Sequence, residues 1–468
     1  MKTKEILLSI KDSIVLFFMN FIKGNLWTKL SYFIMGTSCF RYKQLVRGFL
    51  FLFIQLCFIV FMVPTPQEGN EQDTSSGIYW ISTLDNLGDM TQHEEWNETD
   101  QIYQVIKGDN SLLCLLFGTA SIIICIAMFF MYVLNIKNAV KNQELAKTGG
   151  KINSLKDDIS ELMDEKFHIT ILTGPVITVS VFTIIPLVFM VLMAFTNYNR
   201  INQPPGNLFT WVGFENFINL FGGNSVQTNT FVTLFVWTII WAVTATFLNY
   251  ILGMILALLI NKKGIRLKGM WRTIFVLTIA VPQFVSLLLM SKLLADTGSL
   301  NNVVLLFGGD MVPFLSNATI AKIVVIVVNL WVGIPYTMLS TTGILMNIPA
   351  DLYEAARIDG ANAYQQFRKI TLPYMMHVMT PYLITSFIGN INNFNVIYLL
   401  TGGGPNSLAL FKAGDTDLLI TWLYKLTMTE QEYALAGAIG IIIFIICASV
   451  SLVTFNNSSA LQEEDQFK

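Results

Sequence analysis

The chain has 468 residues, of which 53% are hydrophobic and only 13% are charged, and its formal net charge is −2. A soluble domain carries roughly 25% charged residues, so this composition excludes an ordinary soluble enzyme and predicts an all-α polytopic membrane protein. Five cysteines lie in or beside apolar runs without paired spacing, which favours neither a disulfide framework nor a zinc site.

Residues 1–45 are predicted to form a cytoplasmic or interfacial segment. Lys11 and Asp12 interrupt the apolar run that follows the basic start, and no small-residue cleavage site comes after that run. A signal peptide is therefore disfavoured. We expect residues 5–22 to form a helix that lies in the membrane interface, and a membrane-spanning helix is the alternative.

Eight apolar segments are long enough to cross about 30 Å of hydrocarbon, which takes roughly 20 helical residues. Two of them lie in the N-terminal part of the chain, residues 46–167, and six lie in an expected core domain, residues 168–455. The approximate ranges of the eight predicted spans are 46–63, 111–134, 168–196, 231–260, 271–294, 318–346, 374–400 and 435–455.

The positions of Lys and Arg indicate how these spans are oriented. Most of the 29 basic residues fall in the segments 1–47, 135–167, 261–272 and 347–373. Basic residues are enriched in cytoplasmic loops, so we expect both termini, the linker 135–167 and the tail 456–468 in the cytoplasm. The acidic segment 64–110 would then be external, as a solvated loop or, alternatively, as a docking surface.

The residues absent from the predicted spans restrict the transport chemistry. None of the eight spans contains Asp or Glu, whereas proton or sodium coupling usually uses carboxylates within the membrane. The sequence also lacks a GxxxxGK[ST] phosphate-binding loop. The chain is therefore predicted to be a transport subunit and not an enzyme, and any energy from ATP must come from another chain.

Residues 349–373 form a charged, helix-prone stretch between two apolar spans. Pro349 suits the first turn of a helix, and the Asp359-Gly360 pair allows a turn. Pro373 is expected to end a second helix. We therefore predict two short helices at an angle to each other on the cytoplasmic side.

The residues of the first of these helices are suited to contact with another chain. Ala355 and Ala356 leave little side-chain bulk, and Glu354 offers a carboxylate to a partner cation. With Gly360, this pattern resembles the EAA loop of ATP-binding-cassette (ABC) importer permeases. Three further stretches resemble the carbohydrate branch of that family: WVGFENF at 211–217, NLWVGIPY at 329–336 and NNFNVIYLLTGGGPN at 392–406.

Together with AGDTDLL at 413–419, these stretches make residues 168–455 similar to the larger, MalF-type permease of maltose/maltodextrin importers. The resemblance implies a type I importer permease fold. It also implies an assembly with a second EAA-type permease, two ATPase subunits and an extracellular solute-binding protein, without nucleic acid. Coupling to the ATPase would use Glu354, Ala355, Ala356, Asp359 and Gly360.

In such an assembly the ATPase subunits bind ATP and Mg²⁺, so the resemblance implies no cofactor and no metal site in this chain.

The predicted seventh span carries polar side chains at hydrocarbon depth. Ser386, Asn390 and Asn393 follow an i, i+4, i+7 pattern, which would place them on one helix face. Such residues line a pathway or hydrogen-bond to neighbouring helices. The resemblance implies sugar-binding roles for five residues: Gly333, Tyr336, Ser386, Asn390 and Asn393.

Two residues depart from the pattern expected for that family. Val332 is smaller than the expected leucine, and Gly389 stands where an aromatic side chain is expected. The departures predict a wider sugar site or one that lacks a stacking surface.

The stretch TGGGPN at 401–406 is predicted to be a tight turn, because three glycines and a proline cannot extend a helix. Contact with the solute-binding protein is the functional alternative. That contact would involve Gly402, Gly403, Gly404 and Pro405.

The predicted function is the import of maltose/maltodextrin-type oligosaccharides across a prokaryotic cell membrane by alternating access, driven by separate ATPase subunits. A permease of the same superfamily for another uncharged solute, such as another sugar or a sugar alcohol, is the first alternative. An ion-coupled secondary transporter is the second. A cluster of basic residues in the pathway would favour a phosphorylated solute, and the predicted spans contain none.

Overall fold

The computed structural model describes residues 15–63, 76–97, 101–106, 108–222, 225–262 and 264–456. The chain forms two compact units, Met1–Leu192 with Thr196–Trp211 (unit 1) and Met193–Phe195 with Val212–Lys468 (unit 2). By their contacts, residues 168–192 belong to unit 1, so the division falls later in the chain than the expected domain boundary. The expected interfacial helix at 5–22 and the tail 456–468 lie largely outside the described residues.

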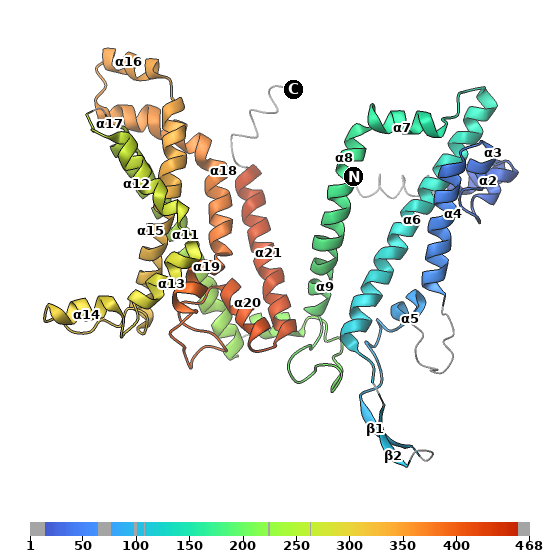
Figure 1. Ribbon diagram of the computed structural model, residues 1–468, viewed down its shortest axis with the longest axis horizontal. Coiled ribbons are helices and arrows are strands. Elements are labelled where there is room, and N and C mark those ends of the chain that lie inside the picture. Colours follow the sequence, from blue (N-terminus) through green and yellow to red (C-terminus); the bar gives the residue numbers. More distant parts are fainter. Residues whose placement is uncertain are drawn as a thin grey trace. The chain divides into compact units, whose positions relative to one another are not determined.

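Among its described residues, unit 1 is helical apart from one small hairpin. Its helices α2, α3 and α7 lie at one end, and α5 and the hairpin lie at the other (Figure 1). The helices are α2 (Leu26–Leu30), α3 (Thr37–Arg41), α4 (Leu45–Met62), α5 (Gly77–Ser82), α6 (Ser111–Thr148), α7 (Leu155–Met163), α8 (Phe167–Val179), the π-helical turn η1 (Ser180–Ile184) and α9 (Ile185–Met193).

The hairpin belongs to the acidic segment that was expected to be a loop. Strands β1 (His93–Asn97) and β2 (Ile102–Ile106) pair antiparallel, with Trp96 opposite Tyr103. Their rings lie 5.0 Å apart in an edge-to-face arrangement, which stabilises a cross-strand pair. The described part of this segment is therefore folded, and residues 64–75 lie outside the description.

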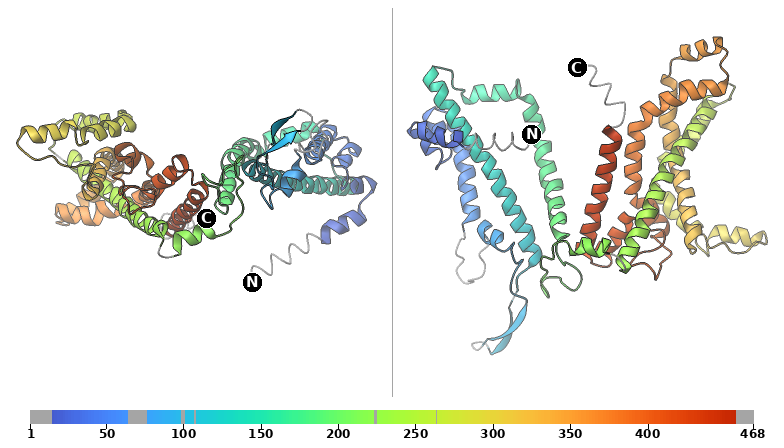
Figure 2. Two further views of the ribbon diagram at one scale, coloured as in Figure 1. Left: turned by 90° about the horizontal axis from the view of Figure 1, so that it is seen from below. Right: turned by 180° about the vertical axis from the view of Figure 1, so that it is seen from behind.

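Unit 2 contains the rest of the helices. They are α10 (Glu215–Phe221), α11 (Val226–Asn261), α12 (Lys268–Ala280), α13 (Gln283–Leu293), α14 (Ser299–Leu306), α15 (Ala318–Asn347), α16 (Ala350–Ile358), α17 (Ala363–Gln366), the π-helical turn η2 (Phe367–Thr371), α18 (Leu372–Ile391), α19 (Phe394–Thr401), α20 (Leu419–Met428) and α21 (Tyr433–Asn456). Helices α16 and α17 lie at the end of unit 2 opposite to α14 and α20 (Figures 1 and 2).

Among the described residues, six helices are long and apolar enough to cross a membrane, and two bent helix pairs raise the number to eight. The prediction of an all-α polytopic protein is confirmed. The predicted span 271–294 is wrong as a continuous helix, because α12 and α13 meet at 86°. Val281 leaves the helical conformation immediately before Pro282, as expected for a residue preceding proline.

The predicted span 374–400 is also not continuous. Helix α18 ends at Ile391, Asn393 caps α19, and the two helices are bent by 40°. At the other end, α17, η2 and α18 form one continuous helix from Ala363 to Ile391, which begins earlier than the predicted residue 374. The prediction that Pro373 ends a helix is wrong. Pro373 lies in the first turn of α18, and a π-helical turn precedes it, so the helix continues although proline has no N–H to donate.

The long helix α11 is the centre of unit 2 and packs against both α15 and α18. Its buried residues include Trp241, which is 0% exposed. Gly253 of α11 lies so close to Thr337 of α15 that an added Cβ would collide with the threonine side chain. Small residues at helix contacts bring backbones together in membranes, and this contact fixes where α11 and α15 cross.

Candidate functional site

A polar cavity of about 210 Å³ lies inside unit 2, between α11, α13, α15 and α18. None of the residues that line it is charged, although most of them are polar. The lining residues are Ala245, Thr246, Asn249, Gln283, Asn329, Val332, Gly333, Tyr336, Thr337, Tyr382, Ser386 and Asn390.

The wall between α11 and α15 is built by close backbone approach. A Cβ added to Gly333 would lie 2.6 Å from Nδ2 of Asn249, so a larger residue there would displace the Asn249 side chain. Thr337 donates a hydrogen bond of 2.8 Å from Oγ1 to the backbone carbonyl of Asn249. The two helices are therefore held in register beside the cavity.

Helix α18 forms the opposite wall. Asn390 donates from Nδ2 to Oγ1 of Thr246 on α11 over 3.0 Å, and its backbone carbonyl accepts a hydrogen bond of 3.1 Å from Nε1 of Trp241. Ser386 lies one turn earlier on α18 and also lines the cavity. These bonds orient the polar side of α18 toward α11.

Two amide atoms of the cavity are buried without a hydrogen-bond partner within the described part of the chain. They are Oδ1 of Asn249, an acceptor, and Nδ2 of Asn329, a donor. Asn329 is only 6% exposed. Leaving a buried polar atom unpaired costs about 1–3 kcal/mol, so the cavity has a donor and an acceptor available to a ligand with hydroxyl groups.

The structure brings together four of the five residues predicted to bind sugar: Gly333, Tyr336, Ser386 and Asn390 all line the cavity. Asn393 does not. It lies in the break between α18 and α19, where its Oδ1 accepts a hydrogen bond from the backbone N–H of Val396 and caps α19. The expectation of one continuous face is therefore wrong for Asn393, although its Nδ2 lies 3.3 Å from Oδ1 of Asn390.

The structure also locates Val332 and Gly389, the two residues that depart from the family pattern. Val332 lines the cavity. A Cβ added to Gly389 would meet no atom within 4 Å, so open space surrounds this glycine.

The sequence analysis missed several polar residues of the cavity, notably Thr246, Asn249, Gln283 and Asn329. The sequence does single out Asn249 and Asn329, because each is an amide within a predicted apolar span, where polar side chains usually have a function. Their convergence could not be anticipated, since it depends on how α11 and α15 cross.

The predicted coupling residues lie on and after α16. Glu354, Ala355, Asp359 and Gly360 are exposed and Ala356 is half-buried. Gly360 has a φ of 78°, the left-handed conformation that favours glycine, and it ends the helix. Two large apolar side chains beside these residues are strongly exposed: Ile358 at 87% and Tyr364 at 67%. Figure 2 shows α16 standing apart from the other helices of unit 2.

One side-chain contact ties α16 back to the bundle. The hydroxyl of Tyr353 lies 2.9 Å from Oγ1 of Thr371, which is buried in η2 at the start of α18. Helix α16 is thus connected to α18 through this contact and to α15 through the chain, which joins the two helices at Ile348 and Pro349.

The glycine-rich stretch at 401–406 forms a compact loop, as predicted. Gly402 and Gly403 have φ values of 60° and 80°. Gly403 is buried, and an added Cβ there would collide with the Asp417 carboxylate. Gly402 is exposed, while Gly404 and Pro405 are half-buried. Of the four residues predicted to touch a solute-binding protein, Gly403 is thus covered by its own chain.

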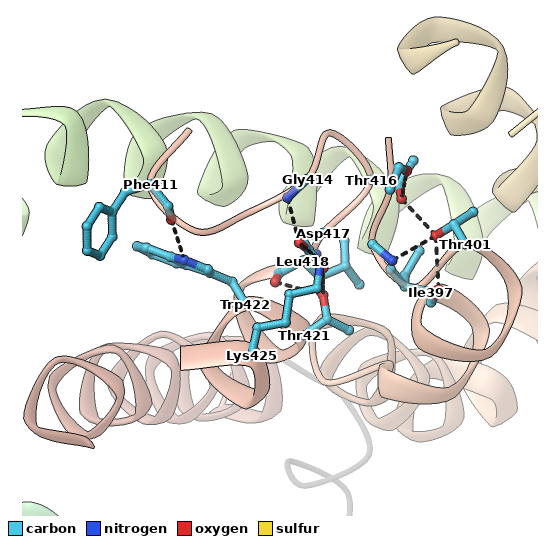
Figure 3. Close-up of polar contacts among 12 residues, drawn as sticks. Ile397, Thr401, Phe411, Gly414, Thr416, Asp417, Leu418, Thr421, Trp422 and Lys425 are labelled. Carbon is cyan, nitrogen blue, oxygen red and sulfur yellow. Dashed lines mark hydrogen bonds and ion pairs between the residues drawn. The ribbon is translucent and has the colours of Figure 1, made fainter. Parts of the chain in front are cut away.

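The carboxylate of Asp417 lies beside Gly403 of this loop and is bound by residues of the following segment (Figure 3). It accepts hydrogen bonds from the backbone N–H of Gly414 at 2.8 Å and from Oγ1 of Thr421 at 2.9 Å, and it pairs with Nζ of Lys425 at 2.6 Å. Burial raises the pKa of Asp417, and the Lys425 ammonium opposes that rise. The described residues contain no group of three or more side chains that could hold a metal ion.

A family model described as "Binding-protein-dependent transport system inner membrane component" matches residues 249–458. The galactooligosaccharides transport system permease protein GanP of Bacillus subtilis is 34% identical over 432 residues, which cover 92% of this chain and 96% of GanP. The maltodextrin transport system permease protein MalC of Streptococcus pneumoniae is 35% identical over 436 residues, which cover 90% of this chain and 93% of MalC.

A crystal structure of a bacterial alginate ABC transporter, in complex with an alginate pentasaccharide-bound periplasmic protein, contains a similar chain. The match has a TM-score of 0.54 at 21% identity and covers 64% of this chain and 97% of the other. At this level of identity the likeness shows the fold alone.

Proposed function

The chain belongs to the family of binding-protein-dependent transport system inner membrane components, and from this premise we propose that it moves maltodextrin-type oligosaccharides across a bacterial cell membrane. It is a multi-pass permease subunit of a sugar importer and not an enzyme. The observation that carries the substrate class is the uncharged polar cavity, which is lined by amides and hydroxyls together with the tyrosines Tyr336 and Tyr382. Sugars are bound by such hydrogen-bonding groups together with aromatic faces.

The geometry supports an assignment of roles within the cavity. Asn390, Ser386 and Asn329 would hydrogen-bond to sugar hydroxyls, and Tyr336, which is 47% exposed, would offer its ring to the apolar face of a pyranose. Gly333 would permit the helix crossing that shapes the site. Asn393 would act through Asn390, since Asn393 donates to that side chain and caps the next helix.

The energy for transport would enter through α16. This helix lies between α15 and α18 in the chain, and these two helices carry opposite walls of the cavity. A partner ATPase that engages Glu354 and the small residues Ala355 and Ala356 would move both walls together. Rigid-body motion of this kind opens a central site alternately to the two sides of a membrane.

The complete importer would contain a second EAA-type permease, two ATPase subunits that bind ATP and Mg²⁺, and an external solute-binding protein. This chain would itself hold no cofactor and no metal. The exposed part of the glycine-rich loop, around Gly402, Gly404 and Pro405, would meet the binding protein, while Gly403 and Asp417 hold the loop in shape.

Transport by the reconstituted importer tests the proposal. Proteoliposomes that contain all subunits should take up maltotriose and maltotetraose when ATP is present. Asn390→Ala and Asn329→Ala should each raise the sugar concentration for half-maximal uptake about fivefold, because each removes one hydrogen bond worth about 1 kcal/mol. Asn302→Ala, at an exposed position of α14 outside the cavity, is the matched control. Equal sugar dependence in all three variants would remove the cavity from the substrate pathway.

Galactooligosaccharides are the second candidate substrate, because a relative that covers 92% of the chain is named for their transport. Both substrate classes are uncharged and rich in hydroxyls, so the cavity chemistry suits either. The same proteoliposomes should be supplied with both sugars in turn. Uptake of galactooligosaccharides without uptake of maltodextrins would reject the first candidate and leave the general proposal of oligosaccharide import in place.

A further inference from the structure

A second polar cavity, of about 380 Å³, lies within unit 1 between α4, α6 and α7. It is distinct from the cavity of unit 2 in its charge. Six ionisable side chains line it, four of them basic: Arg47, Lys141, Lys151, Lys166, Asp158 and Glu161.

Hydrogen bonds between these segments build the walls of this cavity. Asn142 is only 3% exposed and donates to Oε1 of Gln44 at 2.8 Å, and Gln44 donates to the backbone carbonyl of Asn153 at 2.9 Å. Arg47 donates to Oδ1 of Asn138 at 3.0 Å and pairs with Asp158 at 2.5 Å. The cavity is therefore held by contacts that connect α4, α6 and the segment leading into α7.

The charges of the cavity do not cancel. Arg47 pairs with Asp158, Lys166 pairs with Glu161 at 2.6 Å, and Lys151 pairs with a neighbouring aspartate outside the lining. Within the described part of the chain, Lys141 has no ion pair. Oδ1 of Asp158 is buried without a hydrogen-bond partner. The lining thus has one ammonium without an ion pair, that of Lys141, and one carboxylate oxygen without a donor, Oδ1 of Asp158.

The position of the cavity along the helices corresponds to a membrane boundary. Arg47 lies in the first turn of the apolar helix α4, and Lys141 lies beyond the apolar part of α6, after Asn135. Phospholipid headgroups are found at this level, where an apolar helix meets its first polar residues. The distribution of basic residues predicts that this boundary is the cytoplasmic one.

Helix α7 has an unpartnered apolar stripe next to the cavity. Leu155, Ile159, Leu162 and Met163 follow the i, i+4, i+7, i+8 pattern of one helix face, and they are 41–62% exposed. Asp158, at the edge of this stripe, and Glu161, on the other side of α7, both line the cavity. Figure 1 shows α7 running crosswise to α4 and α6. A helix that lies in a membrane interface has this orientation relative to the helices that cross the membrane.

We propose that this cavity binds the headgroup of phosphatidylglycerol from the cytoplasmic leaflet. The phosphate would lie against Lys141, a glycerol hydroxyl would donate to Oδ1 of Asp158, and the acyl chains would cover the apolar stripe of α7. The net positive lining favours an anionic headgroup over a zwitterionic one. Bound lipid would join α7 to α4 and α6 and stabilise unit 1.

The test measures lipid binding by the purified, delipidated full-length chain. Native mass spectrometry would follow titration with short-chain phosphatidylglycerol, and short-chain phosphatidylcholine and free glycerol 3-phosphate would be titrated in parallel. We expect tighter binding of phosphatidylglycerol than of either. Lys141→Gln should weaken that binding about fivefold, because a basic residue near a lipid surface contributes about 1 kcal/mol.

Lys147→Gln is the matched control, since Lys147 lies on the same helix and is exposed but does not line the cavity. Neither substitution breaks an ion pair of the described residues, so both variants should fold. Equal weakening by the two substitutions would show general charge attraction and overturn the proposal. Equal binding of phosphatidylcholine would overturn it as well, and equal binding of glycerol 3-phosphate would identify a soluble ligand in place of a lipid.

Discussion

Asp417 shows at the scale of one residue how a buried charge can organise a loop. Its side chain is 0% exposed and receives a backbone N–H, a hydroxyl and the ammonium of Lys425. Gly403 has no side chain, which leaves room for the carboxylate beneath the glycine-rich loop. A buried ion pair contributes little net stability, but it becomes costly when one partner is removed.

Lys425→Met should therefore destabilise the protein by about 3–5 kcal/mol, because the buried Asp417 carboxylate loses its cation. Asp417→Asn should cost less, since the amide oxygen can still accept from Gly414 while the amide N–H donates to the hydroxyl of Thr421, and Lys425 keeps 19% of its side chain exposed to solvent. Thermal unfolding of the purified variants measures both effects. A Lys425→Met variant with wild-type stability would show that the pair does not support the loop.

At the scale of the element, helix crossings are determined by a few glycines. Gly253 of α11 and Gly333 of α15 each leave space that the facing helix occupies. The cavity between these helices depends on that approach, because side chains at either position would push its walls apart.

Gly253→Val should lower the free energy of unfolding by about 1–3 kcal/mol, the usual cost of forcing extra methyl groups into a packed contact. Gly343→Val makes the same substitution in α15, where an added Cβ would meet no atom within 4 Å, so its effect should stay below about 0.5 kcal/mol. Thermal unfolding in detergent compares the two. Similar losses in both variants would mean that the valine itself, and not the crossing, is responsible.

Most residues of helix α16 are exposed, so a substitution there can be tested for its effect on transport without disturbing the packing of the chain. Glu354→Lys should abolish sugar uptake while leaving the amount of protein in the membrane unchanged, because Glu354 is exposed and has no described partner within its own chain. Glu165→Lys, which makes the same charge change at an exposed position of unit 1, should transport normally. Normal ATP-dependent uptake by Glu354→Lys would contradict the coupling role.

At the scale of the whole molecule, long apolar helices are the dominant feature of the chain. In the part of the chain that the structure describes, six helices, or up to eight spans when each bent pair counts as one, meet the requirements of length and apolarity. Relatives that cover 90% or more of the chain are sugar transport permeases, so these helices belong to a sugar importer permease.

Reporter fusions test the expected orientation. Alkaline phosphatase fused after Asn406 should be active, because the glycine-rich loop is predicted to be external. The same enzyme fused after Gly360 should be inactive, and a fluorescent protein fused to the C-terminus should fold in the cytoplasm and fluoresce. The opposite pattern at the first two sites would place α16 beyond the reach of a cytoplasmic ATPase.

Much of this protein could be predicted from its sequence, because the decisive features are local. The length of an apolar run and the bias of Lys and Arg between loops are read directly along the chain. The EAA pattern at Glu354 to Gly360 is equally local, and the family it indicated is confirmed by the relatives. Even the break at Pro282 has a local signal, because the residue before a proline disfavours the helical conformation.

What only the tertiary structure decided is which side chains meet. Asn249, Asn329 and Asn390 come from three helices far apart in the sequence, and they converge because glycines let α11 and α15 approach closely. Asn393 leaves the expected face because the helix ends before it, and Gly403 is buried because Asp417 occupies the space beside it. Periodicity describes a helix in isolation, whereas crossing points and helix ends depend on the packing of distant segments.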